Sequence, residues 1–455
     1  MLTPANEAIA TVRHALAGRR LVWFGIRGED GEAFLEFPEF ASSVSIIAPT
    51  RSGRIAAPEN VTLEVLGGVR PDLDLYDLDF DSSDEAVELR RQLFKIVSGR
   101  CVVVTYRPSA VVSALAFAMN DTMELAGMFK ERQSAFESKP WVEHSLTKQG
   151  VSGLGWRYVA DEHKSRAKRL LAEAGALILR TSRGSGGVGI VRVESDDDIE
   201  TYWPKQADAF VAVSPFVADA VPMNLSGCVF RDGTVRLHPA SVQLIGIESC
   251  TDRPFGYCGN DFGAVSHLPP TVLTQLDALG RTVGRWLYAE RYLGVFGIDV
   301  LAREDRVHFV EVNARFQGSS AMSAELADGL DVSNLFIDHL AATLGLSTDG
   351  DHGLSLSEWA SNIPARSQVV VHNLRHAQVV RTRAALVADA LGDVRISQLA
   401  HEGLRVEAGA ALARLSFGRS ITDTGFAVSA ATQRAVGQIR AAYSEPDLVR
   451  AIAAS

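Results

Sequence analysis

The 455-residue chain carries 45 Lys and Arg against 55 Asp and Glu, and this net charge of −10 argues against nucleic acid as a main partner, because phosphate binding needs concentrated basic side chains. Hydrophobic residues make up 47%, as in ordinary globular proteins, and no apolar run approaches the ~18 residues of a membrane-spanning helix. The N-terminal segment lacks a signal-peptide core and the four cysteines fit no zinc spacing, so we expect a cytoplasmic protein with reduced thiols and no membrane partner.

The first part of the chain alternates apolar, strand-like runs with helical segments. RLVWFGIRG at 20–28, ASSVSIIAPT at 41–50 and CVVVTYRPSA at 101–110 have the composition of strands. Alternating strands and helices predict a parallel sheet, so we expect an α/β domain over residues 1–134. The glycines after the first strand do not form G-x-G-x-x-G, which argues against dinucleotide binding there. Residues 71–86 are acidic and turn-rich, and we expect a surface excursion or linker.

A glycine-rich loop between two strands is the next feature. ALILRTSRGSGGVGIVRV at 176–193 reads as strand, loop and strand, and an amphipathic helix precedes it at 161–175. Four glycines between 184 and 189 leave almost no side chain, so backbone N–H groups can approach phosphate oxygens and the loop can move as a lid. A flexible hairpin tip is the alternative interpretation.

Residues 209–291 predict a strand, a hairpin and a long helix. AFVAVSPFV at 209–217 is an apolar strand, and Asp232-Gly233 between two alternating runs is a strong hairpin signal. Apolar residues at helical spacing predict a helix over 271–291. The intervening segment 248–261 is rich in turn residues and contains Arg253. It is expected either to face a substrate or to be a plain surface loop.

Residues 294–313 predict a β-hairpin with a charged tip. With a three-residue loop at 304–306, Asp299 faces Glu311 directly and Asn313 shares their face. A two-residue loop would shift the register by one and send the two carboxylates to opposite faces. Adjacent carboxylates need a proton, a basic side chain or a divalent cation. This oxygen-only set suits Mg²⁺, and an exposed face that happens to be acidic is the alternative.

The hairpin resembles the metal-binding signature of the ATP-grasp superfamily, ligases that use ATP to activate a carboxylate. That signature places an acid about twelve residues before E-x-N-x-R on the next strand, and here Asp299 precedes Glu311-Val312-Asn313-Ala314-Arg315. The first strand, the R-T-S-R-G-S-G-G loop and the C-terminal appendage look most like natural-product peptide ligases of the pheganomycin type.

The resemblance implies an α/β, multidomain ATP-grasp fold. Its parts would be an N-terminal α/β (pre-ATP-grasp) domain at 1–134, a nucleotide-binding lobe with the Gly-rich loop at 135–215, a catalytic, metal-binding lobe at 216–362 and a small C-terminal α+β domain at 363–455.

The resemblance also assigns roles to single residues. Lys139 takes the place of the superfamily's phosphate-binding lysine, and Arg180 stands where biotin carboxylase has a lysine. Arg315 would be catalytic, stabilising the acyl phosphate and the oxyanion that follows. The expected ATP-binding residues are Lys139, Arg180, Arg183, Gly184, Ser185, Gly186, Gly187, Gly189, Ser214, Pro215, Phe216 and Asn224. The expected substrate residues are Gln243, Glu248, Arg253, Gly318, Ser319 and Ser320, and the metal ligands are Asp299, Glu311 and Asn313.

The implied activity is an ADP-forming carboxylate–amine ligase that makes an amide or peptide bond through an acyl phosphate, with ATP and Mg²⁺. Its partners would be a small-molecule carboxylate and an amine, an amino acid or peptide. Three alternatives stay open: a carboxylate–thiol ligase loading a carrier protein, a biotin-dependent carboxylase, and a non-catalytic nucleotide-binding protein. Arg180 and the lack of the longer carboxylase C-terminal region count against the carboxylase. Dimers are common in the superfamily, and the sequence leaves a homodimer open.

Overall fold

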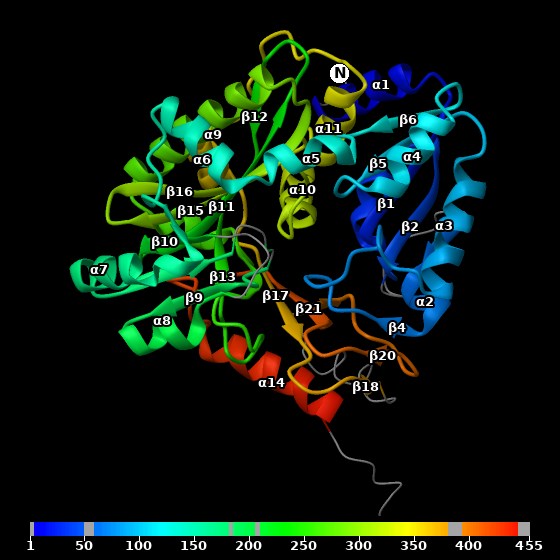
Figure 1. The fold of residues 1–455 in the computed structure, drawn as a ribbon. Coiled ribbons are helices and arrows are strands. Elements are labelled where there is room, and N and C mark those ends of the chain that lie inside the picture. The colour runs from blue at the N-terminus through cyan, green and yellow to red at the C-terminus, as the bar shows by residue number, and fades with distance from the viewer. Residues whose placement is uncertain are drawn as a thin grey trace, which may run out of the picture.

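The structure, a computed structural model, describes residues 4–49, 59–181, 184, 186–204, 210–380 and 394–444. Figure 1 shows an N-terminal unit on one side, a large central sheet, and a smaller lobe carrying α7 and α8 on the other side. The mixed α/β, multidomain arrangement expected from the sequence is confirmed. Within the described residues, no helix combines the length and apolar character that crossing a membrane requires.

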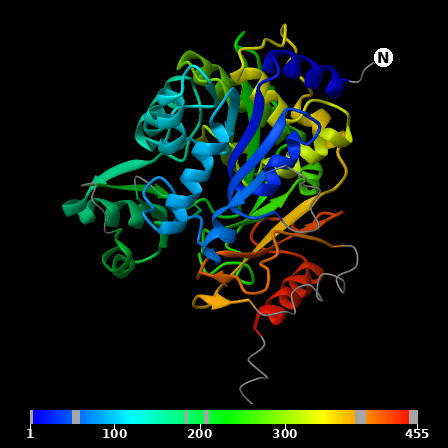
Figure 2. The same cartoon turned by 90° about the vertical axis from the view of Figure 1, so that its right-hand side faces the viewer.

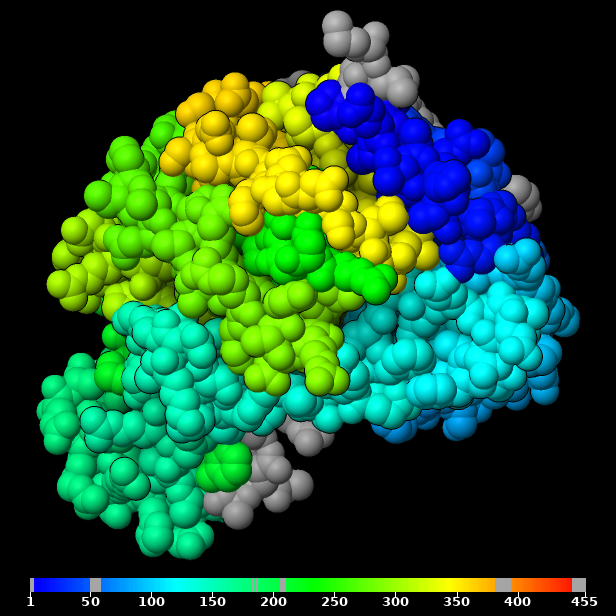
Figure 3. Space-filling model, turned by 90° about the horizontal axis from the view of Figure 1, so that it is seen from above, coloured from blue at the N-terminus to red at the C-terminus, as the bar shows by residue number. Residues whose placement is uncertain are grey.

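The N-terminal unit is a five-stranded, fully parallel sheet in the order β3-β2-β1-β5-β6. Apolar residues of α3 cover one face, while α1 and the later helix α11 cover the other, side by side in Figure 3. The strands are β1 (Arg20–Arg27), β2 (Phe40–Ile47), β3 (Glu59–Thr62), β5 (Cys101–Thr105) and β6 (Met123–Ala126). The helices are α1 (Pro4–Leu16), η1 (Gly28–Phe34), α2 (Leu63–Gly67), α3 (Asp84–Val97) and α4 (Ala110–Ala118).

The smaller lobe is an antiparallel sheet with its own core. Its order is β7-β10-β8-β9, and the apolar faces of α7 and α8 close it. Figure 3 shows this lobe projecting from the rest of the molecule. The elements are β7 (Arg157–Ala160), η2 (Asp161–His163), α7 (Lys164–Ala174), β8 (Leu177–Arg180), β9 (Ile190–Val193), α8 (Asp196–Tyr202) and β10 (Phe210–Pro215). The helices α5 (Lys130–Phe136) and α6 (Lys139–Lys148) lead into it.

A nine-stranded sheet forms the centre. Its main path is β16-β15-β11-β13-β14-β17-β21-β19, and β12 pairs with β11. The strands are β11 (Val221–Val229), β12 (Val235–Leu237), β13 (Ser241–Ile245), β14 (Tyr257–Asp261), β15 (Gly294–Arg303), β16 (Arg306–Asn313), β17 (Ser367–His372), β19 (Arg395–Ser397) and β21 (Ala411–Phe417). The helices around it are η3 (Gly263–His267), α9 (Pro270–Ala289), α10 (Ser320–Gly329), α11 (Leu335–Thr343), α12 (Leu356–Asn362) and α14 (Ala430–Ser444).

The C-terminal region is joined to the central sheet. Its strands β17, β19 and β21 extend the central sheet, because β17 pairs with β14. A small sheet of β18 (Gln378–Val379), β20 (Arg405–Val406) and β4 (Val69–Arg70) also joins it to the N-terminal unit. These three strands lie together in Figure 1, and Figure 2 shows the red helix α14 at one side of the orange C-terminal strands. The predicted boundary at 363 therefore lies within continuous structure.

The hairpin of β15 and β16 differs from its predicted register near the tip. Arg303 pairs with Arg306, so the loop has two residues, and Glu304 adopts a left-handed φ of 55°. The three-residue loop was therefore wrong. A β-bulge at Val310 adds one residue to β16, so Asp299 still faces Glu311.

The acidic segment at 71–86 is not a free surface excursion. Asp79 accepts hydrogen bonds from the first N–H groups of α4, at 2.9 Å for Ala110, and Asp72 is buried against Arg253. The carboxylates in this segment satisfy a helix N-terminus and a basic side chain, which composition alone does not reveal.

Candidate active site

The two carboxylates of the hairpin converge on one face. Asp299 and Glu311 are opposite each other across β15 and β16, and the Asn313 side chain donates to Asp299 Oδ2 at 3.2 Å. The ammonium of Lys139, the first residue of α6, forms an ion pair with Glu311. No group of three or more His, Cys, Asp and Glu side chains at metal-binding spacing occurs in the described residues, so Asn313 is needed to complete a three-oxygen set.

The surroundings separate the charge states of the two acids. Withdrawal from water, and then the Glu311 carboxylate, raise the pKa of Asp299. Burial acts in the same direction on Glu311, but Lys139, Arg180 and Arg315 hold the pKa of Glu311 below its ordinary value. Glu311 is therefore ionised and forms an ion pair with Lys139. Among the described residues, Asp299 has no ion-pair partner.

Asp299 is surrounded by amide groups from neighbouring strands. Asn224 on β11 and Gln243 on β13 donate to Asp299 Oδ1 at 2.7 and 3.0 Å. Asn224, expected among the ATP-binding residues, lies opposite Asp299 in the β11–β15 register and so belongs to this cluster. Gln317, which sequence reasoning missed, also bonds to Asn224, at 2.9 Å. It continues the alternation 311, 313, 315, 317, and that spacing was the available signal.

Helix α6 links the acid pair to the smaller lobe. Glu143 follows Lys139 by four residues, so both lie on one face of the helix. Glu143 forms an ion pair with Arg180 and accepts a hydrogen bond from Tyr158 at 2.6 Å. The guanidinium carbon of Arg180 also lies 3.7 Å from the centre of the Trp156 ring. Both predicted phosphate-binding cations are thus paired with carboxylates of the chain itself.

The glycine-rich loop is seated against other parts of the molecule. Gly186 and Gly187 have φ values of 57° and 83°, and a Cβ on Gly187 would collide with the Phe255 carbonyl. A Cβ on Gly186 would collide with the Asp74 carboxylate. Gly184 approaches the Val188 carbonyl, where an added Cβ would lie 2.6 Å away, and Gly189 packs on Thr181. The predicted residues Arg183 and Ser185 lie outside the described residues.

The predicted adenine hinge is the end of β10. Ser214 is buried and pairs with Ile178 of β8, and Pro215 follows at the surface. Phe216 donates its N–H to the Ala176 carbonyl at 2.9 Å, and the Arg192 guanidinium lies 4.1 Å from its ring centre.

The predicted substrate residues are not all in one place. Arg253 forms ion pairs with Asp72 and Asp74 and so bridges to the N-terminal unit, while Glu248 is exposed. The backbone near Ser320 does not offer all its donors to an anion as predicted. The Ser320 N–H donates to the Gln317 carbonyl at 3.1 Å, because this segment turns tightly into α10.

Gly318 and Ser319, the other two residues of that segment, also contact other parts of the chain. The Ser319 hydroxyl donates to Asn224 at 2.7 Å, and Gly318 leaves room for the Tyr257 hydroxyl, which would lie 2.6 Å from an added Cβ. Arg315 is half-buried. It donates to the Asn313 side chain at 3.0 Å and to the Phe316 carbonyl at 2.9 Å, so it is tethered beside the acid pair.

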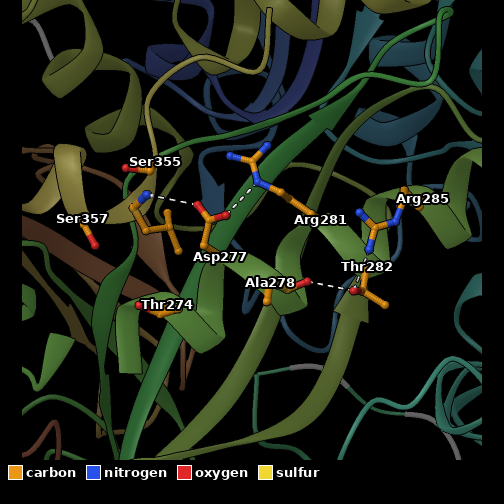
Figure 4. Close-up of a pocket in the computed structure, with 9 residues that line it drawn as sticks. Thr274, Asp277, Ala278, Arg281, Thr282, Arg285, Ser355 and Ser357 are labelled. Atoms are coloured by element: carbon orange, nitrogen blue, oxygen red, sulfur yellow. Dashed lines mark hydrogen bonds and ion pairs between the residues drawn. The ribbon is translucent and has the colours of Figure 1, made fainter. Parts of the chain in front are cut away.

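A surface hollow of about 500 Å³ lies elsewhere, on the outer side of α9 (Figure 4). Asp277 bonds there to Arg281 and to the backbone N–H of Leu356, at 2.7 and 3.3 Å. None of its lining residues belongs to the acid cluster, and Figure 4 shows Asp277, Arg281, Thr282 and Arg285 bonded to groups of the hollow itself.

Comparisons with known proteins give the fold a name. Residues 158–319 match the family described as the ATP-grasp domain. Solved structures agree. A biotin carboxylase from Campylobacter jejuni has a TM-score of 0.60 at 14% identity, covering 88% of each chain. The biotin carboxylase domain of the Hydrogenobacter thermophilus 2-oxoglutarate carboxylase, described as a dimer, has a TM-score of 0.57 at 13% identity, covering 88% of this chain and 86% of that one.

A third match comes from a different enzyme. Carboxyaminoimidazole ribonucleotide synthase from Aspergillus clavatus has a TM-score of 0.58 at 16% identity, covering 93% of this chain and 99% of that one. No curated protein matches the sequence. Residues 158–319 therefore match the ATP-grasp domain, and the chain has the fold expected from its hairpin motif, at identities that speak for the fold alone.

Proposed function

We propose that this protein is an ATP-dependent, ADP-forming carboxylate–amine ligase. The observation that carries the proposal is the convergence of Asp299 and Glu311 on one face of the hairpin, within an ATP-grasp domain. A carboxylate oxygen of the substrate attacks the γ-phosphorus of ATP, and ADP leaves. The amine nitrogen then attacks the acyl carbon, the bond to phosphate breaks, and the nitrogen loses a proton.

The residues at the acid pair fit Mg²⁺. Asp299 and Glu311 supply carboxylate oxygens, which Mg²⁺ prefers, and the ion pair with Lys139 means that Glu311 already accepts a cation. The Asn313 amide oxygen, which accepts from Arg315, would have to exchange that hydrogen bond to join them. Bound there, Mg²⁺ would offset the charge of the β- and γ-phosphates. The structures of the C. jejuni and H. thermophilus relatives are described as complexes with an ATP analogue and with MgADP.

The chain's own cations would hold and orient the nucleotide. Lys139 begins α6, and Arg180 of β8 pairs with Glu143 one turn further along the same helix face. Each of the two cations is thus paired with a carboxylate. Phosphate oxygens would take the place of those carboxylates, so neither cation would be left without a partner when the triphosphate binds. The loop at 184–189, seated on Phe255, would exclude water, which matters because an acyl phosphate hydrolyses wastefully.

Arg315 would act at the reacting carbon. Its guanidinium is tethered by Asn313 and Phe316, so its free donors are oriented before the substrate arrives. Charge that develops on the acyl oxygen would be stabilised there, and loss of one such donor typically costs ~10²–10³ in rate.

The resemblance described from the sequence also bears on the class of substrate. The resemblance of the first strand, the Gly-rich loop and the C-terminal region to pheganomycin-type ligases supports a peptide ligase of natural-product biosynthesis. An amino acid or peptide would then be the amine, and a homodimer is consistent with the H. thermophilus relative.

The test is ADP release by Glu311→Gln, screened with small acids and amino acids, singly and in pairs. We expect a fall of at least ~100-fold, because the substitution removes a metal ligand while keeping the side-chain shape. Glu304→Gln at the exposed tip of the same hairpin is the matched control and should keep full activity.

Three results would overturn the assignment. Near-normal turnover of Glu311→Gln with an intact fold would remove the metal site. ADP release that depends on bicarbonate alone would indicate a carboxylase instead. A product cleaved by hydroxylamine would indicate a thioester, and therefore a thiol as the acceptor.

A further inference from the structure

The Trp156 ring stacks on the guanidinium of Arg180. The guanidinium carbon lies 3.7 Å from the centre of the ring, which is close contact for a cation on an aromatic face. Trp156 immediately precedes β7 and is not among the ATP-binding residues that the sequence predicted. The contact therefore adds a side chain to the region around Arg180.

Both residues lie on the face of the lobe's sheet that α7 and α8 do not cover. Arg180 pairs with Ala212 of β10, and Ala212 pairs with Tyr158 of β7, so the three side chains share one face. Trp156 is two residues before Tyr158 and meets Arg180 on that face. The apolar residues next to them in sequence point the other way, into the core with α7 and α8: Val159, Leu179, Val211 and Val213.

Two buried donors of this pair have no acceptor. Arg180 is 3% exposed, and its Nε has no hydrogen-bond partner among the described residues. The indole Nε1 of Trp156 is likewise buried and without a partner in the described part of the chain. A buried donor without an acceptor is unfavourable, and stacking satisfies neither N–H group. Two such donors on side chains in contact indicate that a ligand supplies the acceptor.

The charged side chains around this pair are balanced. Three basic and three acidic side chains belong to the site: Lys139, Arg180, Arg315, Glu143, Asp299 and Glu311. A phosphate chain adds negative charge to this set, so it has to arrive with a cation, as a magnesium nucleotide does.

The stacked pair is also close to the acid pair. Arg180 forms an ion pair with Glu143, and Lys139 forms one with Glu311. Lys139 and Glu143 are four residues apart on α6, where such side chains have Cβ atoms about 5–6 Å apart. One helical turn therefore separates the two ion pairs, and successive phosphate groups of one nucleotide can span it.

We propose that Trp156 is a nucleotide-binding residue, whose ring orients the Arg180 guanidinium and whose indole N–H donates to a phosphate oxygen of ATP. This inference rests on the proposed ligase function and adds a binding group to that same site. It also accounts for arginine at the position where biotin carboxylase has a lysine. A planar guanidinium stacks on an indole in one orientation and keeps the donors at its edge free, whereas an ammonium has no flat face to orient.

The first test is MgADP binding by the full chain, followed by tryptophan fluorescence and by melting temperature. Trp156→Phe keeps a ring for Arg180 and removes the N–H group, so we expect the Kd of MgADP to rise at least ~10-fold. Trp156→Leu removes both and should raise it at least ~30-fold. Both variants should lose the change in emission that MgADP causes in wild type.

A double-mutant cycle tests the orienting role of the ring. Arg180→Lys should raise the Kd of MgADP at least ~10-fold in the wild-type background, because the oriented fork is lost. In the Trp156→Leu background the same change should raise it less than ~3-fold, since the fork is no longer held. Equal effects in the two backgrounds would show that the ring does not orient Arg180.

Adenosine separates a phosphate acceptor from an acceptor on the base or ribose. It has no phosphate, so wild type and Trp156→Phe should bind it with the same Kd. An equal loss of affinity for adenosine and for MgADP would assign the indole N–H to the nucleoside and overturn the phosphate contact.

Trp203→Phe is the matched control. Trp203 belongs to the same lobe, packs on the α7 and α8 side of the sheet, and its indole N–H already donates to Asp161. The substitution should lower the melting temperature at most, and it should leave the Kd of MgADP and the emission change caused by MgADP intact.

The outcomes separate this inference from the ligase proposal. A lower melting temperature of Trp156→Phe with an unchanged Kd for MgADP would make Trp156 structural and overturn the inference. Retention of the full emission change in Trp156→Phe would also overturn it. Absence of MgADP binding by wild type would count against the ligase itself, whatever the tryptophan variants do.

Discussion

At the scale of residues, the basic side chains expected to bind phosphate already form ion pairs with carboxylates. Lys139 is paired with Glu311, and Arg180 with Glu143 and the face of Trp156. A desolvated cation needs a partner at all times, so each carboxylate keeps its cation in place until an anion replaces it. Under the proposed function, the binding of ATP is an exchange of partners.

Replacing Arg180 by alanine should weaken the binding of ATP more than the binding of the amine. The lost charge-assisted hydrogen bonds are each worth ~1.5–3 kcal/mol, so we expect the KM of ATP to rise roughly 10–100-fold with little change in the KM of the amine. Steady-state kinetics with each substrate varied in turn measures this. Arg169→Ala, on the exposed side of α7, is the control. An equal effect on both substrates would show that Arg180 does not hold phosphate.

His339 makes stability depend on pH. Its Nδ1 accepts the Val295 N–H at 3.0 Å and its Nε2 lies 3.1 Å from the Ala126 carbonyl, so the buried ring is neutral, and burial lowers its pKa to about 4. The unfolded chain binds a proton below about pH 6.5, so the folded state loses up to about 3 kcal/mol as pH falls from 6.5 to 4.

The urea midpoint as a function of pH checks this sign. His339→Asn keeps an acceptor for Val295 but does not titrate, so its midpoint should fall less steeply below pH 6.5 than that of wild type. His14→Asn, on the exposed face of α1, should retain the wild-type slope. Parallel curves for wild type and His339→Asn would mean that this histidine is not the group responsible.

At the scale of elements, the hairpin shows how the core sets the register. Val307 and Phe309 are odd-numbered core residues of β16, whereas Val312 is even-numbered. A regular strand cannot place all three on one face, so an extra residue at Val310 is required. This change of parity is visible in the sequence and predicts the bulge, whereas the tip alone suggested a longer loop.

The glycine-rich loop gives a prediction about closure. Gly187→Ala would place a methyl group against the Phe255 carbonyl, so the loop should no longer pack against Phe255. We expect a larger fraction of ATP to be hydrolysed without amide formation, measured as the ratio of ADP to amide product. Gly175→Ala has a comparable φ of 77° with nothing within 4 Å, so it carries the same backbone strain without the collision. Equal coupling in both variants would rule out a role for the contact.

At the scale of the whole molecule, an early segment around Arg70 is joined to late segments around Gln398 and Ala411. Arg70 is 1% exposed, pairs with Glu64 at 2.8 Å and donates to the Gln398 and Ala411 carbonyls at 2.6 and 3.1 Å. Together with the pairing of β4 and β20, this contact joins the N-terminal unit to the last strands of the central sheet.

Loss of this buried arginine should destabilise both regions. Arg70→Ala leaves Glu64 buried without its cation, for which we expect a loss of about 3–5 kcal/mol. Urea unfolding together with limited proteolysis measures it, and cleavage should appear in both the N-terminal unit and the C-terminal region. Arg91→Ala, which removes a mostly exposed pair on α3, should change the stability by less than about 0.5 kcal/mol. Cleavage confined to one region would show that the two are not coupled.

The sequence by itself determined the α/β class, the strand–loop–strand around the glycines and the pairing of Asp299 with Glu311, because each depends on local periodicity or on a short hairpin. Only the tertiary structure decided that the C-terminal strands extend the central sheet and that Asn224 and Gln317 surround Asp299. These contacts join residues far apart in the chain. No periodicity encodes them, because they depend on which strand edges and charges are brought together when the units pack.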